Sequence, residues 1–326
     1  MSKIYYWPFD NESNSYCERM KKLLSNFGSI SKLNKKKLIL NTIFFKRQEF
    51  LVLNWFENDI VDNLGNLSVK GILKVFIYFI FFRAIFRNFI FVRHNHYPHN
   101  CLKENSFKAK RIIDFLERIP HKVIIHSPVE IEKLNGNRIY VPHPLYEEKK
   151  ITSSVNIGKK IFVIFGRIVE YKKIDKVIQS FPDNLKLIIV GKCEDENYLA
   201  KLRKMIRNNN IEIIDKFVSD KEAEDIIVNS QGLLITHNDD DMIVSGSFFY
   251  ALTVGSKVYC LSTPFFEWVE KELGSEFVEV YNSLDLMNYA LVKEDDKKRV
   301  MKKDVNSLFG DQVIINILSY NIFFNK

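Results

Sequence analysis

Short β-like runs that alternate with helix-like segments constrain this chain more than any other feature. In the second half, the runs KIFVIFG, LKLIIVG, IEIIDKF, GLLITH and SKVYCL are separated by segments with the length and pattern of helices. Alternation of strands with helices of about 10 to 15 residues is typical of βαβ units, whose strands form a parallel sheet with helices on both faces. The sequence therefore predicts an α/β fold.

The first half shows the same alternation with wider spacing. KIYYWPF, EFLVLNWF, RNFIFVRH, HKVIIHS and NRIYVPH are short apolar runs that end in polar residues, as buried parallel strands do. A chain of 326 residues is long enough for two cores. We therefore predict an N-terminal domain over 1–148, a linker over 149–158, a C-terminal domain over 159–310, and a final helix over 311–326 that can cross back to the first domain.

The most apolar segment is Val69 to Val92. Its longest run without a charge, Val75 to Phe82, is far shorter than the ~20 residues of a membrane-spanning helix. We therefore predict that it does not span a bilayer. Lys74, Arg83 and Arg87 among aromatic residues leave two interpretations open: a helix that lies in the headgroup layer of a membrane, or a helix packed in the N-terminal domain.

The net charge of +8 raises the question of an anionic partner. The basic residues are interspersed with acidic ones and accompany no DNA- or RNA-binding motif, so we predict no nucleic-acid partner. A moderately basic protein can bind an anionic membrane surface as a peripheral protein, and this is the favoured use of the charge. The four cysteines form no CxxC pair and follow no cleavable signal, which predicts reduced thiols in a cytoplasmic protein. Together with the basic charge, this predicts a location on the cytoplasmic face of the inner membrane, as a peripheral protein.

The segment FGRIVEYKK has the residues of a phosphate-binding turn. Gly166 ends a β-like run, and Arg167 and Lys172 precede a helix-like segment. Glycine permits close approach of the backbone, a helix N-terminus favours anions, and arginine with lysine can hold a diphosphate. The alternative is that both cations are solvated residues at the start of a helix.

The segment SGSFFYALTVGSKV offers a second anion site. Ser245, Gly246 and Ser247 precede an apolar helix, and the first amides of that helix can bind an anion, although simple capping explains the same residues. Nearby, Asp239 to Asp241 contain the DxD spacing of metal-dependent transferases. Because DxD is common in acidic loops and no other metal-ligand pattern accompanies it, we predict no metal site.

Histidines gather in VRHNHYPHN, where His94, His96 and His99 lie close in sequence. No HExxH motif or cysteine accompanies them, so zinc is not favoured. His94, like His126 and His143, closes a β-like run. Ligands of open α/β sheets bind beyond the carboxyl ends of the strands, and a neutral imidazole there can accept a proton from a hydroxyl group.

Taken together, these segments resemble bacterial GT-B glycosyltransferases of the group-1 type, which build exopolysaccharide, capsule or O-antigen. LNWFEN is similar to the family's HWLE stretch, VRHNHYPHN to TVHN..PH, FGRIVEYKKIDKVIQSF to FGR...KGID..I.AF, and SGSFFYALTVGSKV to SGS...AL..G.PV. The resemblance implies two facing Rossmann-like domains with parallel sheets and a cleft between them. It places the nucleotide-sugar donor in the C-terminal domain and the acceptor in the N-terminal domain.

The resemblance also implies roles for particular residues. Arg167 and Lys172 would stabilise the departing diphosphate, and His94 would lie nearest the reacting sugar. The implied donor-binding residues are Gly166, Gly191, Lys192, Ser245, Gly246 and Ser247, and the implied acceptor-side residues are Asp10, Asn14, Glu57, Asn95 and His99. No metal and no cofactor are implied besides the nucleotide sugar itself, which is a co-substrate.

The chain departs from the family pattern in several places. The glycine-rich acceptor loop near the start is absent and is replaced by Asp10 to Tyr16. Met242 and Tyr250 stand where many relatives have the glutamates of an E-x7-E motif, and Lys173 replaces a common glycine. Retention and inversion both stay open: an inverting enzyme needs a base, for which His94, Asp10 and Glu57 are candidates, whereas in a retaining enzyme the departing phosphate can serve.

The implied function is transfer of a hexose-type sugar from a UDP or GDP sugar onto a lipid-linked saccharide of a bacterial surface polysaccharide. The missing glutamates keep an alternative open. In it, the chain is a non-catalytic sugar-nucleotide sensor or scaffold in a glycan assembly complex.

Overall fold

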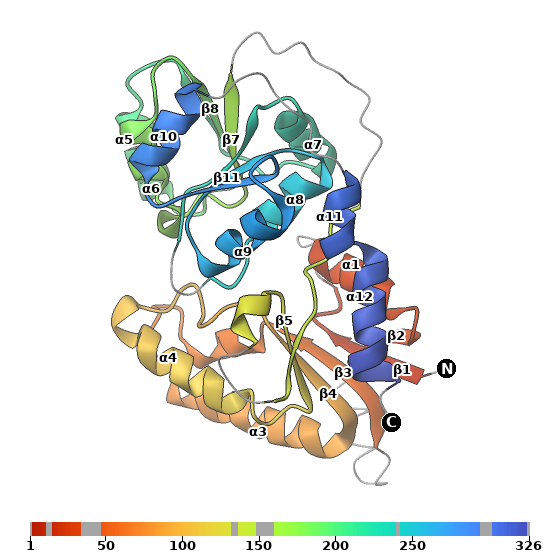
Figure 1. The fold of residues 1–326 in the computed structure, drawn as a ribbon. Coiled ribbons are helices and arrows are strands. Elements are labelled where there is room, and N and C mark those ends of the chain that lie inside the picture. Colours follow the sequence, from red (N-terminus) through yellow and green to blue (C-terminus); the bar gives the residue numbers. More distant parts are fainter. Residues whose placement is uncertain are drawn as a thin grey trace. The chain divides into compact units, whose positions relative to one another are not determined.

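A computed structural model describes residues 2–10, 15–33, 47–131, 136–147, 160–238, 242–293 and 302–324 (Figure 1). The chain divides into two compact units. Unit 1 comprises Met1–Pro144, Asp240–Val244 and Leu308–Lys326, and unit 2 comprises Leu145–Asp239 and Ser245–Ser307. The linker predicted over 149–158 lies outside the described residues.

Unit 1 is built on a six-stranded parallel sheet with the order β2-β1-β3-β4-β5-β6. Its strands are β1 (Ser2–Trp7), β2 (Gly28–Lys32), β3 (Gln48–Asn54), β4 (Phe86–Arg93), β5 (Lys122–Ile125) and β6 (Arg138–Tyr140). Its helices and short turns are α1 (Ser15–Leu24), η1 (Phe56–Ile60), α3 (Val69–Ile85), α4 (Lys103–Leu116), η2 (Pro128–Glu130), α12 (Asp311–Leu318) and η4 (Ser319–Phe323). The five strands predicted for this part of the chain are all present, and β2 is an addition.

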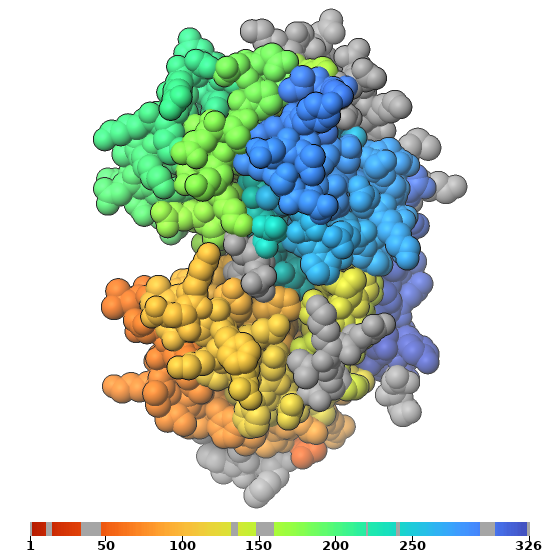
Figure 2. All heavy atoms as spheres, turned by 60° about the vertical axis from the view of Figure 1, so that its left-hand side comes forward, coloured from red at the N-terminus to blue at the C-terminus, as the bar shows by residue number. Residues whose placement is uncertain are grey.

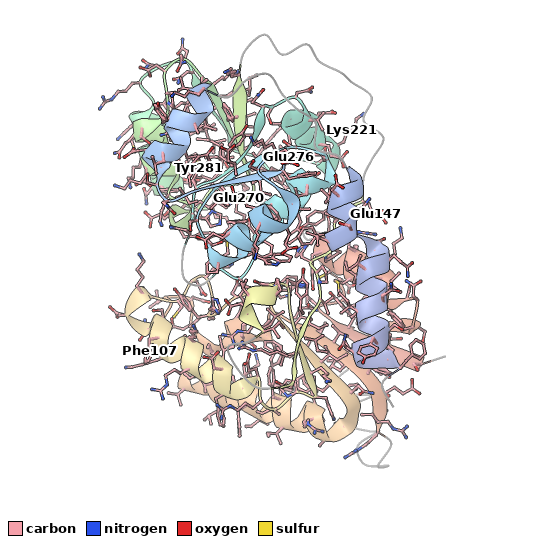
Figure 3. All side chains as sticks on the ribbon, in the orientation of Figure 1. Phe107, Glu147, Lys221, Glu270, Glu276 and Tyr281 are labelled. Carbon is pink, nitrogen blue, oxygen red and sulfur yellow. The ribbon has the colours of Figure 1, made fainter. Side chains whose placement is uncertain are left out.

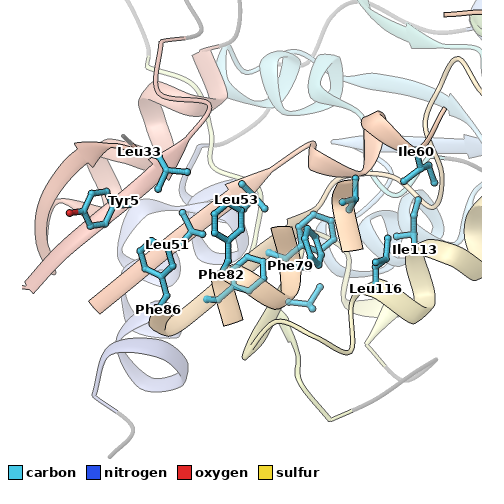
Figure 4. Packing of buried hydrophobic residues seen from close by; sticks show 14 of the residues in the cluster. Tyr5, Leu33, Leu51, Leu53, Ile60, Phe79, Phe82, Phe86, Ile113 and Leu116 are labelled. Atoms are coloured by element: carbon cyan, nitrogen blue, oxygen red, sulfur yellow. The ribbon is translucent and has the colours of Figure 1, made fainter. Parts of the chain in front are cut away.

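Apolar layers cover both faces of this sheet. On one face, α3 and α4 supply buried side chains that include Phe79, Phe82, Ile113 and Leu116 (Figure 4). On the other face, α1 and the C-terminal helix α12 pack together, and Leu318 joins the core. Successive residues of the strands point to opposite faces, so each apolar strand feeds both layers.

The most apolar segment of the chain is a helix followed directly by a strand. Ser68 caps α3, because its hydroxyl accepts a hydrogen bond from the amide of Gly71 at 3.1 Å. The helix ends at Ile85, and β4 begins at the next residue. Within the part of the chain that the structure describes, no helix has the length and apolar character needed to cross a membrane, as predicted.

Unit 2 contains a second six-stranded parallel sheet with the order β12-β11-β10-β7-β8-β9. Its strands are β7 (Ile161–Phe165), β8 (Lys186–Val190), β9 (Ile211–Ile214), β10 (Gly232–Ile235), β11 (Val258–Leu261) and β12 (Val278–Tyr281). Its helices are η3 (Glu170–Lys172), α5 (Ile174–Ser180), α6 (Glu196–Met205), α7 (Asp220–Val228), α8 (Gly246–Thr253), α9 (Pro264–Leu273), α10 (Leu284–Lys293) and α11 (Lys302–Phe309). With unit 1, this confirms the predicted α/β class.

The division of the chain differs from the sequence-based boundaries in two places. Ile243 belongs to the apolar core of unit 1, and Met242 forms an antiparallel bridge with Asn95 there, although the predicted boundaries put this segment in the second domain. Conversely, the amide of Tyr146 donates to Thr253 Oγ1 of unit 2 at 2.9 Å. Core packing and hydrogen bonds, which no local pattern reveals, decide the membership of both segments.

Candidate functional site

Two glycine turns follow the adjacent strands β7 and β8 in unit 2. Gly166 and Gly191 have φ angles of +100° and +151°. A Cβ atom on Gly191 would lie 2.2 Å from the carbonyl oxygen of Gly166, so the turns pack too closely for a side chain there. Parallel strands end at the same edge of a sheet, and this edge is where α/β proteins bind ligands.

Lys172 and Ser247 converge on the first of these turns. The Lys172 ammonium and the Ser247 hydroxyl both donate to the carbonyl oxygen of Phe165, at 3.2 and 3.0 Å. A Cβ atom on Gly166 would lie 3.0 Å from Lys172 Nζ and 3.2 Å from Ser247 Oγ. The structure therefore brings together a glycine and a lysine of the first predicted anion site and a serine of the second, which the family resemblance implies for the same phosphates.

The Lys172 ammonium is buried beside another cation. Burial, and next the positive charge of Arg167, lower the pKa of Lys172 to about 7. Thr236 Oγ1 donates to the Lys172 carbonyl at 2.7 Å and so holds the backbone of the turn, while Arg167 is exposed. A bound anion would offset the free-energy cost of burying this cation. A buried cation with a strongly shifted pKa is more typical of a binding site than of a stable core.

The start of α8 supports anion binding more than simple capping. Ser245 occupies the N-cap position but makes no side-chain capping hydrogen bond. Gly246 is exposed, and Ser247 bonds to the β7 turn. Tyr250, which stands where the pattern of the resembled family has a glutamate, is buried with its ring 5.0 Å from that of Phe165, so it serves packing.

Two neighbouring lysines have local partners. Lys192 Nζ lies 3.3 Å from the Asp215 carboxylate, so the predicted nucleotide role of Lys192 would compete with an ion pair. Lys173 Nζ donates to Asn238 Oδ1 at 2.8 Å. The φ angle of Lys173 is 54°, in the left-handed region that favours glycine, so the lysine occupies a strained position where the family pattern has glycine.

In unit 1, the histidines that close β4, β5 and β6 lie together. The ring centroids of His94 and His126 are 5.5 Å apart, and those of His126 and His143 are 5.3 Å apart. Tyr16 of α1 contacts all three rings, and its hydroxyl bonds to His126 Nε2 at 2.9 Å. Because His126 Nδ1 donates to the Val141 carbonyl, Nε2 is the acceptor.

His94 is held by Asn54 and Trp55, which the sequence patterns do not single out. Asn54 Nδ2 donates to the Trp7 carbonyl, so its Oδ1 accepts from His94 Nε2 at 3.1 Å. The imidazole also stacks on Trp55 at 4.2 Å and 18°. This tautomer leaves the lone pair on His94 Nδ1, and burial together with the neighbouring histidines holds the pKa of His94 well below its usual value. The neutral ring can accept a hydrogen bond from a hydroxyl but is a weak base.

A buried ionic network fixes the loop that follows His94. Arg93 Nη1 lies 2.7 Å from both Asp114 Oδ1 and Glu117 Oε2, and Arg138 Nη2 lies 2.6 Å from Glu117 Oε1. Arg93 also donates to the carbonyls of Asn95 and His96, at 3.1 and 2.9 Å. No short-range spacing predicts this network, because its members come from β4, α4 and β6.

The remaining predicted acceptor-side residues differ in their surroundings. Glu57 is buried beside Arg93 and the backbone of His94, and burial raises its pKa to about 7. Asp10 forms an ion pair with Lys32, Asn95 is buried, and His99 is exposed. Asn14 and Asp239 to Asp241 lie outside the described residues. Among the residues whose positions are given, no three histidine, cysteine or acidic side chains are grouped to hold a metal ion.

The histidine group predicts acid sensitivity. The pKa of His126 falls to about 4 on burial, and those of His94 and His143 fall in the same direction. Between about pH 6.5 and 4 the unfolded chain therefore binds more protons than the folded one. The free energy of unfolding decreases as the pH is lowered through this range, by about 3 kcal/mol for His126 alone. The raised pKa of Glu57 makes the folded protein more stable as the pH is lowered, which offsets the effect of only one of the three histidines.

We expect His126→Gln to flatten the loss of melting temperature between pH 7 and 4.5, measured by circular dichroism. His99→Gln is the control, because His99 is exposed. Equal slopes in His126→Gln and the unaltered protein would contradict the assignment.

The comparisons with known proteins rest on structure. No family model matches the chain, and no curated protein matches its sequence. Solved structures of GT-B glycosyltransferases match it at low identity. Sucrose-phosphate synthase from Thermosynechococcus elongatus matches with a TM-score of 0.70 and 9% identity, covering 98% of each chain.

Two further structures also match over nearly the whole length. Anabaena HepE in complex with UDP and glucose has a TM-score of 0.63, and the lipopolysaccharide outer core galactosyltransferase WaaB has 0.62, each with 12% identity over 99% of both chains. The chain spans only about half, 55%, of TarM from S. aureus, another structure that it matches. The structural neighbours are GT-B glycosyltransferases, and the chain has the two-domain GT-B fold.

Proposed function

We propose that this protein is a glycosyltransferase that moves a hexose-type sugar from a UDP or GDP sugar onto a lipid-linked saccharide in bacterial surface polysaccharide synthesis. The observation that carries the proposal is the convergence of Lys172 and Ser247 on the Gly166 turn, with Arg167 beside it. HepE binds UDP and glucose, and WaaB acts on a lipopolysaccharide, which supports the donor and acceptor classes.

In the proposed reaction, the bond between the sugar and the diphosphate breaks while an acceptor hydroxyl attacks the sugar. Charge develops on the departing diphosphate, where Lys172, Arg167 and the first amides of α8 stabilise it. His94 accepts a hydrogen bond at Nδ1 on the acceptor side. Its low pKa favours a positioning role for the imidazole and leaves the departing phosphate as the proton acceptor, as in a retaining reaction.

The proposal includes a cytoplasmic enzyme at the inner membrane that needs no metal and no cofactor beyond the nucleotide sugar. A lipid-linked acceptor requires contact with a membrane surface, and the excess of basic residues suits an anionic one.

Thermal melts with a panel of nucleotide diphosphates and sugar nucleotides test the donor site, because a ligand of the folded state raises the melting temperature. We expect a selective shift with UDP or GDP compounds. Arg167→Ala should remove the shift and lower turnover by about 100-fold or more, with no loss of stability, because Arg167 is exposed. Lys176→Ala, also at an exposed cation, is the control. Unchanged turnover in Arg167→Ala would refute the assigned role.

The second candidate function is a non-catalytic sensor or scaffold. The burial of Tyr250 at a family glutamate position favours it, since one carboxylate for the donor sugar is replaced by a packing residue. A sensor would show the thermal shift with sugar nucleotides but no release of UDP or GDP with any acceptor extract, whereas the proposed enzyme releases the nucleotide.

A further inference from the structure

Helix α3 is apolar on both of its sides. Its inner side, with Phe79 and Phe82, packs in the core of unit 1. Its outer side exposes Val69, Leu73, Phe76, Ile77 and Ile80. A surface helix of a globular domain ordinarily presents polar residues outward, so this outer side lacks the pattern of a face that meets only water.

Helix α4 extends the apolar surface. The ring of Phe115 lies 6.3 Å from that of Phe76 and nearly parallel to it. Phe107 projects from α4 away from the sheet (Figure 3) and is 68% exposed. In Figure 2 the orange and yellow-orange atoms of the two helices adjoin on one face of unit 1. We call this surface the α3–α4 face, and its apolar members are Val69, Leu73, Phe76, Ile77, Ile80, Phe107 and Phe115.

Positive charges surround these apolar side chains. Helix α3 contains two lysines and an arginine but no acidic residue. Lys70 of α3 and Lys108 of α4 are exposed, and the Arg111 guanidinium of α4 lies over the Phe107 ring at 5.6 Å. The acidic residues nearby are few: Glu104 opens α4, and Asp59 pairs with Lys74 at 2.6 Å.

We infer that the α3–α4 face binds an anionic lipid bilayer, with α3 lying in the plane of the interface. Apolar and aromatic side chains beside a row of cations match the acyl boundary and the phosphates of a headgroup layer. With 17 residues, α3 is too short and too charged to cross. A second copy of the chain would oppose cations to cations across a two-fold axis, which disfavours a dimer on this face.

The inference deepens the proposed function and rests on it in one respect, since a lipid-linked acceptor gives the protein a reason to bind a membrane. The α3–α4 face belongs to unit 1, which carries the His94 group, so lipid binding would hold the proposed acceptor side at the bilayer. The test below measures lipid binding without turnover.

The test is flotation of the full chain with vesicles of phosphatidylcholine, alone or mixed with phosphatidylglycerol. We expect binding to the anionic vesicles only. Leu73→Ser with Ile77→Ser should lower the partition coefficient by about tenfold or more. The matched control is Leu286→Ser with Tyr289→Ser on α10 of unit 2. Its two residues are 54% and 63% exposed, the same values as for Leu73 and Ile77.

Charge and depth are tested separately. Lys70→Glu with Lys108→Glu, one on each helix, should weaken binding by at least about fivefold, since each basic residue near an anionic surface contributes on the order of that factor. Lys204→Glu with Lys271→Glu, at exposed positions of unit 2, should not. In the variant Ile77→Trp, the emission of the unaltered protein is subtracted, which leaves the emission of the new tryptophan. On vesicle binding this emission should shift to the blue, and brominated lipids should quench it.

Three results would overturn the inference. The first is an equal loss of vesicle binding in the double serine variant of α3 and in that of α10, and the second is a lack of quenching of the Ile77→Trp fluorescence. The third is a dimer that forms without vesicles and is lost in Leu73→Ser with Ile77→Ser. Thermal shifts with sugar nucleotides on the same preparations separate it from the proposed function. If the protein does not bind vesicles but sugar nucleotides still raise its melting temperature, only the membrane inference fails. If it binds vesicles but sugar nucleotides do not change its melting temperature, only the proposed transfer fails.

Discussion

Lys172→Met will strongly weaken donor binding and slow transfer while making the ligand-free protein more stable near pH 6. The ammonium is buried, its pKa is lowered to about 7, and Phe165 offers it only a carbonyl oxygen. Removing an electrostatic contact to a developing charge costs roughly 100- to 1,000-fold in rate. Removing the buried charge should raise the melting temperature by about 5 °C, or about 2 kcal/mol.

The sign follows from the direction of the shift. The pKa of Lys172 is lower in the folded protein than in the unfolded chain, so its destabilising effect is full below about pH 7 and declines as pH rises toward the unfolded value. The stability difference between Lys172→Met and the unaltered protein should therefore shrink from pH 6 to pH 9, in melts followed by circular dichroism. A difference that grows with pH would contradict the buried-cation account.

The adjacent lysine provides the control. Lys173 bonds to Asn238 instead of the Gly166 turn, so Lys173→Met should change donor binding little. Donor binding by the unaltered protein should also weaken above about pH 7, by up to tenfold per pH unit, because binding then requires protonation of Lys172. Isothermal titration with UDP in buffers of different ionisation enthalpy measures that proton uptake, which Lys172→Met should lack.

Glu117→Gln is expected to cause the largest loss of stability. The carboxylate is fully buried between Arg93 and Arg138, and its loss leaves two guanidinium groups with less counter-charge. Breaking a buried ionic network in this way costs about 3 to 5 kcal/mol. For a unit of this size that is a fall of roughly 10 °C in melting temperature.

Denaturation in urea, followed by circular dichroism, measures the effect. Glu104→Gln in the first turn of α4, the helix whose C-cap is Glu117, is the matched control, because Glu104 is exposed, and it should change stability by less than about 0.5 kcal/mol. Arg138→Met added to Glu117→Gln should recover part of the loss, since it removes one of the uncompensated charges. Strictly additive losses in the double variant would show that the three groups do not act as a network.

The sequence by itself determined the fold class and placed Gly166, Arg167 and Lys172 in one short turn after a strand. Alternating apolar runs predicted every described strand except β2 and β12, and glycine after a β-like run marked the turn at Gly166, whereas Gly191 was implied only by the family resemblance. These signals are local: strand burial, helix periodicity and glycine conformation each act over a few neighbouring residues. Gly166 and Lys172 lie within one such short segment, and for that reason the sequence alone is enough to assign them to one turn.

Only the tertiary structure decided which distant residues meet. Ser247 reaches the Phe165 carbonyl from another segment, Tyr16 touches three histidines that follow three different strands, and Glu117 joins arginines of β4 and β6. The two-sided apolar character of α3 is visible in the sequence, but which side faces the core is not. Burial, the shifted pKa values and buried ion pairs all depend on the packing of segments far apart in the chain, which no local pattern specifies.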